Sequence, residues 1–154
     1  MHKRRLLAFL LALPLGHAWG VAALGEKFDP ARDAMADVDQ AVARARAEGK
    51  VVLVDVGGEW CAWCHILDRF IASQPEVQQA LSAQYVWLKV NFSPKDRNEA
   101  LLSRWPKPRG YPHLYVLGAD GQLLASQASS ELESGRSYDT ARFLAFLRRQ
   151  RPAA

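Results

Sequence analysis

VVLVDVGGEWCAWCH, residues 51–65, is the stretch that decides the fold of this chain. It begins with an apolar, valine-rich run at 51–56 that only Asp55 interrupts, a pattern typical of a strand buried on both faces. A glycine pair then predicts a turn, and apolar residues at helical spacing follow it. The only two cysteines of the chain, Cys61 and Cys64, therefore stand at the start of a helix, directly behind a buried strand.

The spacing of these two cysteines indicates redox chemistry. Two thiols in a C-x-x-C pair can close a small disulfide and reopen it. A thiolate at a helix N-terminus is stabilised by the helix dipole and by free backbone N–H groups, so Cys61 is expected to be the attacking thiol. Cys64, one turn further in, is expected to resolve the resulting mixed disulfide. A disulfide across so short a loop adds almost nothing to stability, which favours a catalytic use.

The letters CAWCH, residues 61–65, leave other chemistry open. They also spell an attachment site for c-type haem, with His65 as the iron ligand. Against haem, a buried strand leads straight into the motif, and Met35, which haem could use as a distal ligand, fits a helix core instead. A copper or zinc site of Cys61, Cys64 and His65 is a further alternative, although adjacent side chains diverge on a helix. The preferred interpretation needs neither cofactor nor metal.

The first 23 residues have the pattern of a secretory signal peptide. Basic residues at 3–5 precede an apolar run at 6–15 and small residues up to a cleavage site predicted after Ala23, or alternatively after Gly20. A membrane anchor is the alternative, but a span needs about 20 apolar residues. We therefore expect export to a compartment in which disulfides persist.

The charge balance excludes one class of partner. Twenty basic and 16 acidic residues give a formal charge of +4. Three of the basic residues belong to residues 1–23, which leaves 17 basic against 16 acidic and a net charge of +1. No basic stripe with interleaved aromatics is present, so no nucleic-acid partner is expected. The mature protein is expected to be a monomer.

Periodicity predicts one α/β domain at 33–150, after a lead-in at 24–32 and before a tail at 151–154. The order of elements favours a central mixed sheet with helices on both faces. The predicted helices cover residues 33–48, 61–72, 75–83, 94–105 and 138–149, the last two before and after the hairpin. The predicted strands cover residues 51–56, 85–92, 113–117 and 122–126, and an irregular polar loop is expected at 126–137.

From about residue 33 to 149 the chain resembles thioredoxin-fold proteins. The resemblance rests on VVLVDVGGEWCAWCH, on LKVNF at 88–92 and on RGYPHLYVLGADGQLL at 109–124, which follow one another at thioredoxin spacing. SQPEV at 73–77 is similar to the DPEV-like turn of exported members. The resemblance implies a thioredoxin fold and a thiol–disulfide oxidoreductase that acts on protein disulfides or dithiols, and we expect it to act as a reductase. A non-catalytic thioredoxin-like binding module is the alternative.

The resemblance also assigns roles to residues outside the cysteine pair. Asp55 falls where thioredoxins keep a buried acid, which would move the proton of Cys64; a structural bond to backbone is its alternative. Lys89 falls where the partner of that acid often stands, or it extends to solvent. Pro112 falls at the family's cis-proline. Ala62 and Trp63 replace the usual Gly-Pro, and His65 replaces a lysine, so the resemblance does not fix the direction of the reaction.

The last expectations concern the surface that meets a substrate. Trp63, between the cysteines, is expected to be exposed, while Trp60 packs nearby in a supporting role. The main chain of Tyr111, next to Pro112, is expected to pair with an extended substrate segment. An exported reductase needs electrons from across the membrane, so a membrane-embedded thiol donor is the implied partner and the periplasm the expected compartment.

Overall fold

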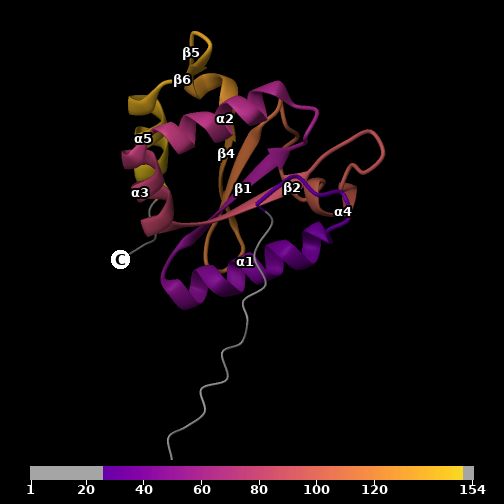
Figure 1. Cartoon of the computed structure of the whole chain (residues 1–154). Helices are drawn as coiled ribbons and strands as arrows, with labels where there is room; N and C mark the ends of the chain where they lie inside the picture. Colours follow the sequence, from indigo (N-terminus) through magenta and orange to yellow (C-terminus); the bar gives the residue numbers. More distant parts are fainter. Residues whose placement is uncertain (1–25, 151–154) are drawn as a thin grey trace, which may run out of the picture.

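A computed structural model describes residues 26–150 of the chain. Four strands form one sheet in the order β2-β1-β3-β4, and helices cover both of its faces (Figure 1). The strands of this sheet are β1 (Val51–Gly57), β2 (Tyr85–Asn91), β3 (His113–Leu117) and β4 (Leu123–Ala128). The helices are α1 (Ala34–Glu48), α2 (Ala62–Ser73), α3 (Pro75–Gln84), α4 (Glu99–Leu102) and α5 (Thr140–Arg149). The expected mixed α/β sheet of a thioredoxin fold is confirmed.

The central strand positions the cysteine motif. β1 is buried along its whole length, runs parallel to β2 and pairs antiparallel with β3. Its even-numbered side chains join the core that α1 and α4 cover, and Val51 and Leu53 join the core under α2, α3 and α5. Because side chains alternate along a strand, Asp55 and Gly57 also face α2. The motif helix therefore packs on the face of the sheet to which Asp55 belongs.

Local signals fix the ends of the helices. Asp33 caps α1 by accepting a hydrogen bond from the Ala36 N–H, and Gly49 ends it in the left-handed region at φ 65°. Pro75 occupies the first turn of α3, where its missing N–H costs nothing. These boundaries agree with the predicted ones to within one or two residues.

The predicted helix at 94–105 is largely wrong, because only α4 is helical. Ser93 and Asp96 exchange backbone hydrogen bonds across a tight turn. Asn98 follows in the left-handed region, at φ 46°, and its side-chain amide donates to the Asn91 carbonyl at 2.7 Å. Asn and Asp side chains stabilise such turns in competition with a helix, which delays the helix until residue 99.

The segment expected as an irregular loop at 126–137 is ordered. β4 runs to Ala128, a 3₁₀ turn covers Ser129–Leu132, and β5 (Glu133–Ser134) pairs antiparallel with β6 (Ser137–Tyr138). Gly135, at φ 59°, allows the tight reversal between the two short strands. The segment contributes Leu132 and Tyr138 to the core beneath α5.

The predicted signal peptide at 1–23 and the tail at 151–154 lie outside the described residues. Across residues 26–150, every helix is too short or too polar to cross a membrane.

Candidate active site

The two cysteines are joined in a disulfide at the N-terminus of α2, with their Cα atoms 5.2 Å apart. Cys61 is the N-cap of the helix, and its sulfur accepts a hydrogen bond from the Cys64 N–H at 3.2 Å. Cys61 is 3 % exposed and Cys64 is fully buried, so Cys61 is less open than the sequence suggested. A backbone donor thus points at the Cys61 sulfur, where it would stabilise negative charge.

A side chain from the lead-in covers the disulfide. Phe28 is buried, and with Cys61 and Cys64 it forms a small apolar cluster on which Trp63 and Tyr111 also pack. No motif in the sequence predicts this role for Phe28. Its signal was present nonetheless, since it is the one large apolar residue in the polar stretch 25–33.

Gly57 lets the strand approach this cluster closely. A Cβ atom at this position would overlap the Cys64 sulfur, and it would also crowd the Phe28 ring at 3.1 Å. The absence of a side chain is therefore required by the packing of α2 against the end of β1.

Asp55 is a fully buried carboxylate on the same strand face. Neither of its oxygens accepts a hydrogen bond from a backbone N–H within residues 26–150, and the N–H of Trp87, which also has no other partner there, is the nearby side-chain donor. Burial raises the pKa of Asp55 to about 7; the positive charge of Lys89 and the indole N–H of Trp87 oppose this shift, and the negative charge of Asp68 adds to it. Asp55 can therefore gain or lose a proton near neutral pH.

Lys89 is the register partner of Asp55, yet its ion pair is with another acid. Its Nζ donates to both carboxylate oxygens of Asp68, at 2.5 and 2.6 Å, and lies 4.5 Å from the Phe28 ring centroid. Sequence reasoning missed Asp68. A signal was available, because Asp68 follows Cys64 by four residues and so shares its helix face.

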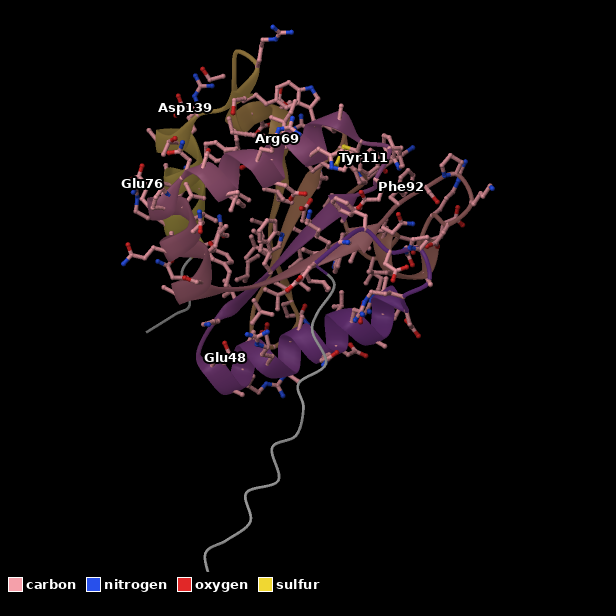
Figure 2. The ribbon with its side chains drawn as sticks, in the orientation of Figure 1. Glu48, Arg69, Glu76, Phe92, Tyr111 and Asp139 are labelled. Atoms are coloured by element: carbon pink, nitrogen blue, oxygen red, sulfur yellow. A yellow bond between two sulfur atoms is a disulfide. The ribbon has the colours of Figure 1, made fainter. Side chains whose placement is uncertain are left out.

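Three aromatic rings lie next to the disulfide and contact one another, and Figure 2 labels two of them, Tyr111 and Phe92. Tyr111 stacks on Phe92 with ring centroids 4.6 Å apart and meets Trp60 edge-on at 5.7 Å. The indole of Trp60 is 56 % exposed and held in place, because its N–H donates to the Phe92 carbonyl at 2.7 Å. The peptide bond between Tyr111 and Pro112 is cis.

The two tryptophans of the motif have exchanged the places expected for them. Trp63 is half-buried and packs edge-on against Tyr138, with ring centroids 5.6 Å apart. Trp60, expected to pack, is the exposed ring. The first turn of α2 points residue 63 toward the β5–β6 hairpin, a segment that the sequence did not predict as ordered structure.

His65 lies beside the motif and supports the turn before it. Its Nε2 lies 2.8 Å from the Glu59 carbonyl, at hydrogen-bond distance. In this state the Nε2 of His65 lies at hydrogen-bond distance from a carbonyl oxygen, and the two cysteine sulfurs are bonded to each other. A haem or metal site would need these atoms for other bonds. Among the residues that the structure describes, no three His, Cys, Asp or Glu side chains cluster as a metal site would require.

Comparison with known families and proteins agrees with this geometry. The model of the thioredoxin-like family matches residues 33–119. The thiol:disulfide interchange protein DsbD of Pseudomonas fluorescens is 37 % identical over 93 residues, which are 60 % of this chain and 16 % of that protein. DsbD of Klebsiella pneumoniae is 32 % identical over 114 residues, 74 % of this chain and 18 % of its own length. The chain thus spans less than a fifth of these curated relatives.

Solved structures show the same fold. A disulphide isomerase from Xylella fastidiosa superposes with a TM-score of 0.69 at 24 % identity, covering 82 % of this chain and 98 % of that one. A thioredoxin from Thermus thermophilus superposes with a TM-score of 0.53 at 27 % identity, covering 72 % of this chain and 81 % of its own.

Proposed function

The chain belongs to the thioredoxin-like family, and on that premise we propose that it is a thiol–disulfide oxidoreductase acting on protein substrates through Cys61 and Cys64. The observation that carries the proposal is the disulfide itself, closed at the N-terminus of α2 with a backbone N–H aimed at the Cys61 sulfur. The thiol:disulfide interchange proteins among its relatives support the same activity.

In the reduced protein, the Cys61 thiolate attacks a substrate disulfide. A mixed disulfide forms between Cys61 and one substrate sulfur, and the other substrate sulfur leaves as a thiolate. Cys64 then loses its proton, and its thiolate attacks the Cys61 sulfur and releases the second substrate thiolate. Two electrons pass to the substrate, which becomes a dithiol, while the Cys61–Cys64 disulfide closes in the state that the structure holds.

Asp55 is the group we propose to receive the Cys64 proton. Its pKa of about 7 lies close to neutral pH, so the carboxylate can accept a proton from the thiol and pass it on later. Gly57, two residues further along the same strand face, abuts the Cys64 sulfur, which supports a position of Asp55 behind the buried cysteine. Lys89 and Asp68 adjust the charge around that carboxylate.

For the direction of electron flow we propose reduction of exported substrates. Residues 1–23 and the resemblance to exported thioredoxin-like proteins support a periplasmic location. A protein there that reduces disulfides must be re-reduced, and a membrane-embedded thiol donor would supply the two electrons. Tyr111 packs on the disulfide cluster and Trp60 meets its ring, and we propose that substrate segments bind over Trp60, Tyr111 and Pro112.

Two cysteine variants test the proposal. Cys64→Ser should accumulate mixed disulfides with a disulfide-containing peptide, because Cys61 attacks and nothing resolves the product. Cys61→Ser should trap far less peptide, because Cys64 has no exposed surface. The wild-type protein should also reduce many equivalents of the peptide when dithiothreitol is supplied. Equal trapping by both variants would contradict the assigned roles, and trapping without turnover would favour the binding module.

A further inference from the structure

A groove opens next to Tyr111. It is a cavity of about 420 Å³ lined by residues of the single segment, 92–112, that connects β2 to β3. Its apolar walls are the side chains of Phe92, Leu102, Trp105 and Tyr111. Tyr111 belongs both to this wall and to the cluster that packs on Cys61 and Cys64. Tyr111 and Phe92, two of these wall residues, lie next to the disulfide end of α2 (Figure 2), so Tyr111 links the disulfide to the groove.

The rim of the groove is positively charged. Residues 93–111 contain five basic and two acidic residues, and of the five basic ones Arg109 is paired with Glu131. Arg97 and Lys107 line the groove, are exposed, and form no ion pair with any residue from 26 to 150. Arg97 and Tyr111 line the same groove, and the charge of Arg97 opposes the rise that burial causes in the pKa of Tyr111. Glu99 is the one acidic lining residue.

We propose that this groove binds the segment next to the reacting cysteine of a partner protein, and that this segment carries an apolar side chain flanked by acidic residues. The proposal rests on the function proposed above and specifies its substrate class. The apolar walls would bury the side chain, while Arg97 and Lys107 would pair with the acids at the rim. An extended segment of this kind, at roughly 3.3 Å per residue, would run from the disulfide over Tyr111 into the groove.

Peptide binding to the oxidised protein tests the groove without any exchange reaction. The probes are extended peptides in which serine replaces cysteine, with phenylalanine or alanine at the apolar position and with glutamate or lysine flanks. Isothermal titration calorimetry at low salt should give a Kd about tenfold lower for the phenylalanine peptide with glutamate flanks than for the phenylalanine peptide with lysine flanks. Because rim charges are screened, this preference should shrink in 0.5 M salt, and alanine should weaken binding at either salt concentration.

Charge reversal assigns the preference to the groove. The double variant Arg97→Glu/Lys107→Glu should invert it, so that the lysine peptide binds more tightly. The matched control Arg136→Glu/Arg149→Glu makes the same change in net charge at two exposed residues, one between β5 and β6 and one in the last turn of α5. The control should keep the preference for glutamate.

The outcomes separate this inference from the proposed function. Equal Kd values for the glutamate and lysine peptides, or equal effects of the two double variants, would overturn the groove. If the wild-type protein does not exchange disulfides with a neutral probe, hydroxyethyl disulfide, the proposed function is overturned instead. In that case a glutamate preference that inverts in Arg97→Glu/Lys107→Glu would still support the groove as an acidic-segment site.

Discussion

The ammonium of Lys89 is bound to Asp68, with its Nζ 2.5 Å from one carboxylate oxygen and 2.6 Å from the other. Asp55, which faces Lys89 across the β1–β2 register, has no hydrogen-bond partner in the part of the chain that the structure describes. Lys89 therefore acts on Asp55 only through space, and Asp68 offsets part of that attraction. The Lys89–Asp68 pair thus tunes a buried acid that it does not touch.

Removing the charge of Asp68 and removing the charge of Lys89 should move the pKa of Asp55 in opposite directions. Asp68→Asn removes a negative charge that raises the pKa of Asp55 and frees Lys89, so the pKa should fall below about 7. Lys89→Met removes the charge that lowers it, so the pKa should rise. Carboxyl ¹³C NMR titration measures both. Glu48→Gln is the control, because Glu48, the last residue of α1, pairs with Arg44 of the same helix and with Lys50 just after it. Shifts of the same sign in both variants would contradict this coupling.

Asp55 should also make the protein less stable as the pH rises. Its pKa is about 7 in the folded protein against 3.8 as its ordinary value, so between these values the folded state binds more protons. The free energy of unfolding then falls from pH 4 to pH 7, by up to about 4 kcal/mol. Asp55→Asn should flatten this dependence, as measured by urea unfolding across that range. An unchanged slope would mean that another group dominates it.

The sequence predicted the parts of the site that short-range patterns determine. The valine-rich run gave β1, and the cysteine spacing with its glycine turn gave the start of α2. It failed where the outcome depends on tertiary contacts. Asn98 adopts a left-handed conformation because its side chain reaches the Asn91 carbonyl, and helical periodicity alone carries no sign of that bond.

The same reason explains the partners that were missed. Lys89 was expected beside Asp55, but its long side chain reaches Asp68 on the helix above. Trp63 was expected to be exposed, but the β5–β6 hairpin brings Tyr138 against it. Each of these contacts joins α2 to a residue that is distant in the sequence, in β2 or in β6. No local sequence pattern predicts which distant segment contacts the helix.

Gly57 should tolerate no side chain. In Gly57→Ala, the new Cβ overlaps the Cys64 sulfur and crowds Phe28, so strand and helix must separate. We expect a loss of at least about 1–3 kcal/mol in the free energy of unfolding, as for other overpacked cores. Gly110→Ala is the matched control, since no atom lies within 4 Å of the added Cβ. Urea unfolding of the oxidised proteins compares them, and equal losses would show that Gly57 has room.

The two tryptophans of the motif should separate binding from stability. Trp60 is 56 % exposed, so Trp60→Ala should change the free energy of unfolding little. If its fixed indole anchors a substrate segment, the same change should weaken binding of the serine-substituted glutamate–phenylalanine peptide by about 1–3 kcal/mol.

Trp63→Ala should do the reverse, because it removes the edge-on contact with Tyr138 and leaves the exposed ring of Trp60 in place. Its free energy of unfolding should fall by about 1–3 kcal/mol, and its peptide affinity should stay within a factor of about two, well under 1 kcal/mol. Calorimetry and urea unfolding on both variants make the comparison. If only Trp63→Ala loses peptide affinity, then Trp63 and not Trp60 contacts the substrate, as the sequence pattern first suggested.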